Sequence, residues 1–246
     1  SGGVDSSVTA YLLKEAGYEV TGVHLRCWNR NGCNAADAED ARRVAEKLDI
    51  PFYVFDLEKE YKSLVVDYMV DGYARGFTPN PDVMCNKEIK FGLFLKKALE
   101  MGADYVATGH YVRIKNDELR IESSKKPSFI IHHSLFTAHD KNKDQSYFLW
   151  TLTQKQLRHC LFPIGDYLKS DVRKLAKKAG LPTADKKDSQ GLCFVGKVTL
   201  KEFLGEHLPP KTGLIINTDG AVLGEHAGIH LYTVGQLHCI GFVLTC

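Results

Sequence analysis

The stretch Ser1-Gly2-Gly3-Val4-Asp5-Ser6 opens the chain and leads directly into a segment of helical periodicity, from residue 5 to about residue 16. Its two glycines allow a tight turn, so successive backbone N–H groups can point into one concavity and bind an anion. The helix adds its positive N-terminal end, and the hydroxyls of Ser1, Ser6 and Ser7 add donors. Because neither G-x-x-x-x-G-K-S/T nor G-x-G-x-x-G is present, the stretch predicts a phosphate-binding loop outside those two classes. A glycine-rich turn without a ligand is the alternative interpretation.

Downstream of this loop, apolar patterns typical of strands alternate with patterns typical of helices. Strands are predicted at 20–25, 52–57 and 105–107, and helices at 37–48, 61–74 and 87–100. Strands separated by helices are typical of a parallel sheet. We therefore predict an α/β fold with a parallel, doubly wound sheet. Two prolines and an asparagine within residues 76–82 predict an exposed loop there.

The second half of the chain has a weaker pattern. It predicts short polar, β-like pieces at 116–134, helices at about 153–160 and 169–179, a loop at 186–196 and a short helix at 199–204. Asp219-Gly220 lies between two short apolar runs and predicts a β-hairpin. These patterns predict a catalytic domain at 1–197 and a small β-rich domain at 198–246.

The composition is that of a globular protein with a substantial core, because 44% of the 246 residues are hydrophobic. A net charge of +2 permits a polyanionic partner without requiring one. No apolar run is long enough to span a bilayer and no signal peptide is recognisable, so we expect a cytoplasmic protein without a membrane partner. The seven cysteines form no C-x-x-C pair, and we predict no metal site.

Two of the cysteines lie in polar segments. Cys85 lies where the predicted loop meets a helix start, and both the helix end and Lys87 would stabilise its thiolate. Cys193 lies in the polar loop that follows Lys186 and Lys187. Polar loops are where reactive groups are expected, whereas Cys160, on a predicted helix, has the surroundings of an inert thiol.

These stretches together closely resemble the tRNA-specific 2-thiouridylase (MnmA) family, within the N-type ATP pyrophosphatase (PP-loop) superfamily. The resemblance rests on SGGVDS (1–6), TPNPDVMCNKEIKF (78–91), ATGHY (107–111), KDQSYFL (143–149), DSQGLCFVG (188–196) and LYTVGQ (231–236). It implies an adenine nucleotide alpha hydrolase-like fold followed by a small β-rich domain. Family members also have an apolar strand before the loop and a C-terminal β-barrel, and we expect both to be absent from the sequence as given.

The resemblance also implies roles for individual residues. By similarity, ATP would be bound by Ser1, Gly2, Gly3, Val4, Asp5, Ser6, Leu25 and Gly109. The target base would contact Asn80, Pro81 and Asp82, and the tRNA would contact His110, Lys143, Asp144 and Gln145. Cys85 and Asp82 would be catalytic, and Cys193 would carry a catalytic persulfide received from a sulfur-donor protein.

The implied reaction is the ATP-dependent 2-thiolation of the wobble uridine in the anticodon stem-loop of tRNA. Attack of the uridine C2 oxygen on the α-phosphate of ATP would release pyrophosphate, with Mg²⁺ sharing the phosphate charge. Sulfur from Cys193 would then displace AMP, and a disulfide between Cys85 and Cys193 would remain for a reductant to break. Asp82 would move a proton near the base. The uridine must be splayed out of the loop to react.

Three alternatives stay open at this point. A synthetase of the amidotransferase type would share the phosphate loop but gives no reason for two cysteines in polar loops. A tRNA-binding or sulfur-carrier module without turnover is the non-enzymatic alternative. Within the thiolase interpretation, an iron–sulfur cluster could replace the persulfide, with Cys27 or Cys33 as a third thiolate.

Several other polar residues are given the simpler interpretation. His132 and His133 are interpreted as surface residues and not as metal ligands. Most lysine pairs are interpreted as solvated faces. We predict phosphate contacts only for Lys186 with Lys187, and for Lys141 with Lys143.

Overall fold

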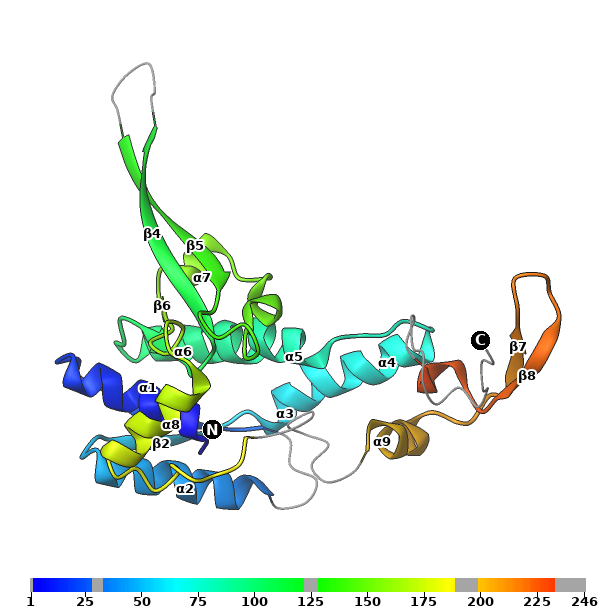
Figure 1. Cartoon of the computed structure of the whole chain (residues 1–246), viewed down its shortest axis with the longest axis horizontal. Coiled ribbons are helices and arrows are strands. Elements are labelled where there is room, and N and C mark those ends of the chain that lie inside the picture. Colours follow the sequence, from blue (N-terminus) through cyan, green and yellow to red (C-terminus); the bar gives the residue numbers. More distant parts are fainter. Residues whose placement is uncertain (1, 28–32, 122–127, 189–198, 233–246) are drawn as a thin grey trace.

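Two pairs of parallel strands form the framework of the molecule (Figure 1). The computed structural model describes residues 2–27, 33–121, 128–188 and 199–232. Strand β1 (Gly22–Arg26) pairs with β2 (Phe52–Asp56), and β3 (Val106–Ala107) pairs with β6 (Cys160–Leu161). The predicted parallel α/β architecture is confirmed. Within the described residues the two pairs are not hydrogen-bonded to each other.

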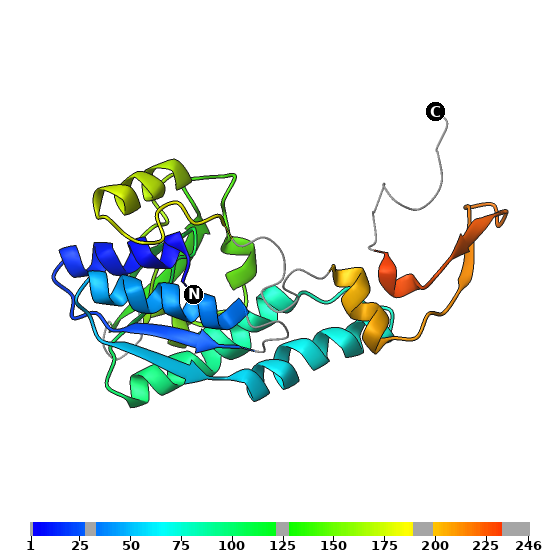
Figure 2. The ribbon, with the colours of Figure 1, turned by 90° about the horizontal axis from the view of Figure 1, so that it is seen from below.

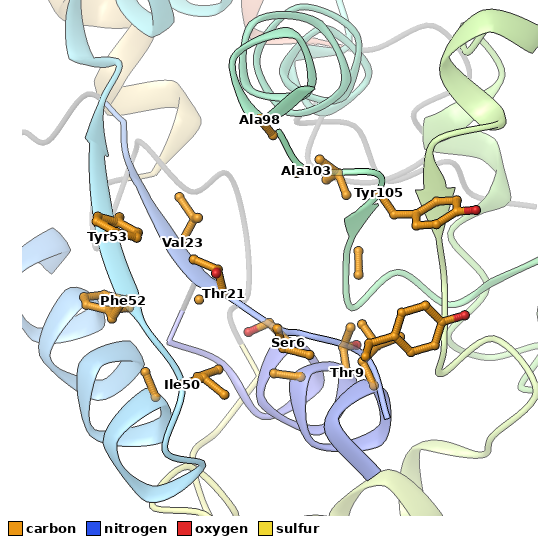
Figure 3. Close-up of a pocket in the computed structure, with 18 of the residues that line it drawn as sticks. Ser6, Thr9, Thr21, Val23, Ile50, Phe52, Tyr53, Ala98, Ala103 and Tyr105 are labelled. Carbon is orange, nitrogen blue, oxygen red and sulfur yellow. The ribbon is translucent and has the colours of Figure 1, made fainter. Parts of the chain in front are cut away.

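A cavity of about 680 Å³ lies between the two strand pairs. Figure 3 shows Val23 of β1 and Thr21, just before β1, on one side of it, and Ala103 and Tyr105, just before β3, on the other. The lining includes Gly2 and Ser6, so the cavity reaches the glycine-rich loop.

Helices cover both faces of the first strand pair. Figure 2 shows α2 (Cys33–Lys47) on one side of β1 and β2, and α6 (Leu95–Glu100) on the other. Helix α1 (Val4–Glu15) packs with α2 and α8 (Lys169–Lys178) around a common core. Fully buried members of this core are Val8, Ile164 and Val172. This packing fixes α1, and with it the glycine-rich loop, against α8.

Two long helical segments follow β2. The first comprises α3 (Glu58–Tyr61), a π-helical stretch η1 (Lys62–Asp67) and α4 (Tyr68–Ala74). The second comprises α5 (Pro81–Met84), a second π-helical stretch η2 (Cys85–Phe94) and α6. The predicted loop at 76–82 therefore ends at residue 80, two residues earlier than expected. Asn80 caps the helix, and Pro81 occupies its first position, where the missing N–H costs nothing.

The β character predicted at 116–134 is confirmed, but the strands are longer than expected and form one hairpin. Its strands are β4 (Val112–Ile121) and β5 (Ser128–Thr137), paired from Val112↔Thr137 to Ile121↔Ser128. The hairpin extends away from the rest of the molecule (Figure 1). At the base of the hairpin, Val112, Ile114 and Leu135 pack on a core cluster. The polar run at 115–118 interrupts the apolar alternation that would have indicated a long strand.

Short elements complete the region between the hairpin and α8. They are η3 (Ser146–Leu149), α7 (Gln154–Leu157) and β6. Cys160 lies on strand β6 and not on the predicted helix. Its thiol is buried, and burial raises its pKa to about 12, in keeping with an inert cysteine.

The last described part contains α9 (Leu200–His207), the hairpin β7 (Gly213–Ile216) and β8 (Val222–His226), and η4 (Ile229–Leu231). The predicted hairpin is confirmed, with Gly220 at a φ of 82° in its turn. Phe203 and Leu204 of α9 are buried in the core that η1 and α4 form. No helix among the described residues is long and apolar enough to cross a membrane.

Candidate functional site

The glycine-rich loop forms a tight concavity at the start of α1. Gly2 has a φ of 63°, and a Cβ there would collide with the carbonyl oxygen of Asp37, so only glycine fits. Gly3 is the N-cap of α1 and provides no side-chain cap. The hydroxyls of Ser6 and Ser7 donate to the Gly3 carbonyl at 3.1 and 2.8 Å. The first-turn N–H groups are therefore left uncapped by side chains, as an anion-binding helix end requires.

Gly109 lies directly against this loop. A Cβ at Gly109 would stand 2.7 Å from the Asp5 carbonyl carbon and from the Ser6 nitrogen, closer than real Cβ atoms come. Gly109 follows β3, at the carboxyl end of a parallel strand, where ligands of α/β sheets bind. The structure thus brings together two stretches that sequence analysis assigned to ATP from distant parts of the chain.

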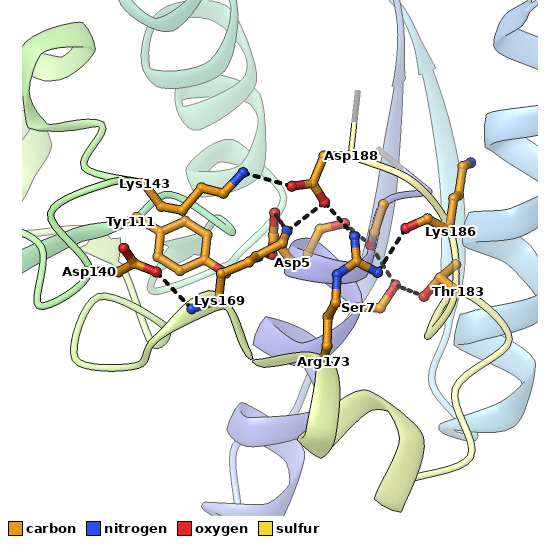
Figure 4. Close-up of polar contacts among 12 residues, drawn as sticks. Asp5, Ser7, Tyr111, Asp140, Lys143, Lys169, Arg173, Thr183, Lys186 and Asp188 are labelled. Atoms are coloured by element: carbon orange, nitrogen blue, oxygen red, sulfur yellow. Dashed lines mark hydrogen bonds and ion pairs between the residues drawn. The ribbon is translucent and has the colours of Figure 1, made fainter. Parts of the chain in front are cut away.

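Asp5, in the first turn of α1, is held by two groups that sequence analysis missed. The ammonium group of Lys169 donates to both of its oxygens, at 2.7 and 2.8 Å. The hydroxyl of Tyr111 donates to Oδ1 at 2.9 Å. Figure 4 shows Lys169, at the start of α8, and Tyr111, just before β4, next to Asp5. The Lys169 side chain is only 12% exposed, so its charge acts in surroundings of low dielectric constant.

Asp188 joins three cations beside this pair. Its carboxylate lies 2.9 Å from Lys169, 2.7 Å from Arg173 and 2.9 Å from Lys143. Burial alone would raise the pKa of this carboxyl, but the hydrogen bonds from Lys169 and Lys143 outweigh it and lower the pKa to about 2. Three cations thus face the carboxylates of Asp5 and Asp188 (Figure 4), with the Asp140 carboxylate also in this cluster. The network places the Lys169 ammonium next to the loop.

Two of these cations, Lys169 and Arg173, escaped sequence analysis for a physical reason. Lys169 and Arg173 lie in a helix whose other lysines are solvated, such as Lys174 at 77% exposure. No local feature of the sequence distinguishes these two cations from the solvated lysines of the same helix. The only signal was indirect: Asp188 begins a segment that already carried the family resemblance.

Lys186 is engaged elsewhere than predicted. Its ammonium pairs with Asp37 and Asp40 of α2, at 2.7 and 2.6 Å. Burial would lower the pKa of Lys186, but the hydrogen bonds that its ammonium donates to these two carboxylates raise the pKa above its usual value. Lys141 donates to the Thr137 hydroxyl at 2.6 Å. In this structure both lysines therefore bind protein groups.

The segment Asn80–Cys85 forms a capped helix start. The Asn80 side chain accepts a hydrogen bond from the Val83 N–H at 3.0 Å, and the Asn86 amide donates to the Asp82 carbonyl at 3.0 Å. Burial raises the pKa of the Asp82 carboxyl, against a smaller opposing effect of Lys90. A carboxyl with a raised pKa holds a proton more readily than an exposed aspartate does.

Cys85 lies deeper in this helix than sequence analysis placed it. It is the fifth helical residue, and its N–H is bonded to the carbonyls of the preceding turn. The expected position at the open, positively charged helix end was wrong, because the cap falls at Asn80. The half-buried Cys85 instead borders the core cluster of η1 and α4, as do Leu25 and Cys27. Leu25, a predicted ATP contact, therefore packs against the same core cluster as Cys85.

His110 is buried, with 7% exposure, between the rings of Phe91 and Phe162. Its Nδ1 lies 2.7 Å from the Thr108 hydroxyl, and burial lowers the pKa of the imidazole well below its usual value. An imidazole held neutral inside an aromatic cluster does not form a surface contact. The predicted tRNA contact of His110 therefore has no support in this geometry.

Asp144 and Gln145 use their side chains within the protein. Asp144 accepts from the Ala138 N–H at 2.6 Å and from the Ser146 hydroxyl at 2.7 Å. The Gln145 side chain accepts from the Tyr111 N–H at 3.0 Å. These bonds fix the segment that presents Lys143 to Asp188.

Two predicted site residues, Ser1 and Cys193, lie outside the described residues, so the persulfide and its distance from Cys85 are untested. Among the residues that the structure describes, no three His, Cys, Asp or Glu side chains are grouped as for a metal ion.

The fold and the loop geometry define a class of protein. A family model described as the tRNA methyl transferase HUP domain matches residues 1–197, and the chain belongs to this family. A second model, described as the tRNA methyl transferase PRC-barrel domain, matches residues 201–242. More particularly, the chain is a member of the tRNA-specific 2-thiouridylase MnmA family.

Its relatives of that name are similar along nearly the whole chain. The protein of Lactococcus lactis is 50% identical over 98% of this chain, which spans 62% of that protein's length. The protein of Listeria monocytogenes is 50% identical over 98% of this chain and 63% of its own length. That of Christiangramia forsetii is 46% identical over 96% of this chain and 68% of its own length. Among solved structures, the NMN synthetase of Francisella tularensis is 18% identical, with a TM-score of 0.46 over 84% of this chain and 72% of that chain.

Proposed function

We propose that the whole protein is an ATP-dependent sulfurtransferase that 2-thiolates the wobble uridine of tRNA. The observation that carries this proposal is the 50% identity, over 98% of the chain, to relatives named tRNA-specific 2-thiouridylase. The chain spans about 62% of the length of those relatives, so the activity, the substrate and the partners are proposed for the whole protein. The family description names methyl transfer instead, but a methyl donor gives no use for an uncapped phosphate loop beside a cationic cluster.

The proposed ATP site is the loop Ser1–Ser6 with Gly109. Its support is a cradle that a Cβ at Gly2 or Gly109 would fill, together with the uncapped start of α1. ATP, with Mg²⁺ on its phosphates, would supply the activated phosphorus that turns the uridine C2 oxygen into a leaving group. The Lys169 ammonium would neutralise phosphate charge, because its hydrogen bond to Asp5 holds it beside the loop. It is also shielded from solvent.

The proposed base site is the capped start of α5. Asn80, Pro81 and Asp82 would receive the splayed uridine, and Asp82, with its raised pKa, would exchange a proton with it. Cys193 would carry the transferable sulfur as a persulfide, and its terminal sulfur would attack C2 and displace AMP while still bonded to Cys193. The Cys85 thiolate would then attack the Cys193 sulfur, which breaks the bond to the transferred sulfur and leaves 2-thiouridine. A reductant would break the resulting Cys85–Cys193 disulfide by supplying two electrons and two protons.

The proposed partners are the anticodon stem-loop of a tRNA and a protein that donates persulfide sulfur, in the cytoplasm and without a membrane. Residues 1–197 and 198–246 are proposed as separate domains. The contacts of Phe203 and Leu204 with the first domain's core mean that these two parts share one hydrophobic core.

Release of AMP and pyrophosphate that depends on added tRNA tests the enzymatic part of this proposal. Wild type is expected to release both products only with tRNA, and Cys85→Ser and Cys193→Ser are expected to form no thiolated nucleoside. A small-molecule synthetase would keep full turnover in both variants. A binding or carrier module would release neither product. If an anaerobic preparation contained iron and absorbed visible light, the mechanism would use an iron–sulfur cluster and not a persulfide.

A further inference from the structure

A groove of about 600 Å³ lies beside the start of α5 and outside the phosphate site. Three aromatic side chains line it, Tyr68 of α4, Tyr147 of η3 and Trp150 directly after η3. Three polar residues complete the lining that matters here, Asn80, Lys87 and Thr151. The groove therefore adjoins the proposed base site, because Asn80, the N-cap of α5, belongs to both.

The aromatic rings of this groove are unusually exposed. Trp150 is 70% exposed, Tyr147 is 65% exposed and Tyr68 is 40% exposed. A single exposed aromatic residue needs no explanation, but three around one hollow form an apolar surface that water solvates poorly. Tyr147 and Trp150 are neighbours in one helical turn, and the fold brings Tyr68 of α4 to them from a distant part of the chain.

The polar groups of the groove suit a ligand with charge and hydrogen-bonding edges. Lys87 pairs with Glu88 at 2.9 Å, and both side chains are partly solvated, so the pair is weak and the ammonium can turn to a phosphate. The Thr151 hydroxyl is buried without a hydrogen-bond partner among the described residues, a cost that a bound polar group would remove.

We propose that this groove stacks an unpaired nucleobase of RNA that neighbours the target uridine. Ring faces next to a cation and a free hydroxyl match a planar base attached to a phosphate, and single-stranded bases bind on such platforms. An apolar peptide would match the rings but leave Lys87 and Thr151 without use. This inference rests on the proposed function, because it takes the anticodon loop as the source of the base.

Binding of an anticodon stem-loop RNA to the whole protein tests this inference. Trp150→Ala is expected to weaken RNA binding about tenfold or more, as for the loss of one stacked base, and Trp150→Phe is expected to retain most of it. ATP affinity and thermal stability are expected to stay at wild-type values, since the ring is largely solvated. Tyr18→Ala is the matched control, because Tyr18 is also exposed, at 48%, but lies outside the groove.

Fluorescence gives a second readout that does not depend on stability. The chain has two tryptophans, so Trp28→Phe leaves Trp150 as the reporter. Stem-loop RNA is expected to quench it, and a fully paired duplex is not. Suppose that Trp150→Ala binds the stem-loop as well as wild type does, and that the RNA does not quench Trp150 in Trp28→Phe. The groove is then not a stacking site, while the proposed function stands. A docking site for another protein would give that same result. If wild type does not bind the stem-loop at all, both proposals fail.

Discussion

At the scale of single residues, the site combines groups that local sequence reveals with groups that only the fold brings in. Asp5 and Gly109 lie in recognisable motifs, and the structure places them in contact. Lys169 has no motif of its own, and Tyr111 ends the motif ATGHY without a predicted role, yet both bind Asp5. Such residues cannot be predicted from spacing, because their roles depend on contacts across more than a hundred residues of chain.

Lys169→Met is expected to weaken ATP binding about tenfold or more, because it removes a screened charge from the phosphate loop and leaves Asp5 without its cation. Isothermal titration with ATP measures this. Lys174→Met is the control, since Lys174 lies on the same helix but is 77% exposed. Equal ATP affinity in both variants would show that Lys169 does not contribute to ATP binding.

Asp188→Asn is expected to make stability less dependent on pH. The folded-state pKa of Asp188, about 2, lies below its ordinary value of 3.8. The stabilisation is therefore complete above about pH 5 and is lost as the pH falls toward 2. After allowance for solvent screening, wild type is expected to exceed Asp188→Asn by about 1–2 kcal/mol in unfolding free energy at pH 7.

Urea unfolding of both proteins between pH 7 and pH 2 measures this difference. The gap is expected to narrow steadily below pH 5. A gap that stays constant to pH 2 would show that the Asp188 carboxylate is not held by the cations around it.

At the scale of elements, the sequence predicted regular segments well and their boundaries less well. Helices with one apolar face, such as α1 and α2, were found because they pack on a single core. The full length of the β4–β5 hairpin was missed because the polar run at 115–118 interrupts the alternation of apolar and polar residues. The start of α5 was missed because prolines indicate a loop, whereas a proline after a capping asparagine starts a helix.

Asn80→Ala is expected to lower the unfolding free energy by about 1 kcal/mol, the usual cost of a lost N-cap. Asn80→Asp keeps a side-chain acceptor for the Val83 N–H and is expected to be close to wild type in stability. Urea denaturation compares the variants. Equal destabilisation by both would mean that the cap does not hold α5.

At the scale of the whole molecule, α9 ties the last part of the chain to the first. Its Phe203 is fully buried among residues of η1 and α4, such as Val65 and Met69. The boundary predicted at residue 198 was based on the pattern of predicted elements along the sequence, which carries no information about packing between the two parts.

Phe203→Ala is expected to destabilise the whole protein by about 3–4 kcal/mol, because it leaves a cavity in a shared core. Leu223→Ala, on the hairpin at 48% exposure, is the control and is expected to cost far less. Chemical denaturation followed by circular dichroism measures both. A small effect of Phe203→Ala would mean that α9 does not contribute to that core.

The most direct test of the central claim is the nucleoside composition of tRNA treated with the whole protein, ATP and a persulfide donor. Digestion and mass spectrometry are expected to reveal 2-thiouridine at the wobble position, formed only when ATP is present and absent with Cys85→Ser. Unmodified uridine in the complete reaction, or a methylated nucleoside in place of the thiolated one, would contradict the account.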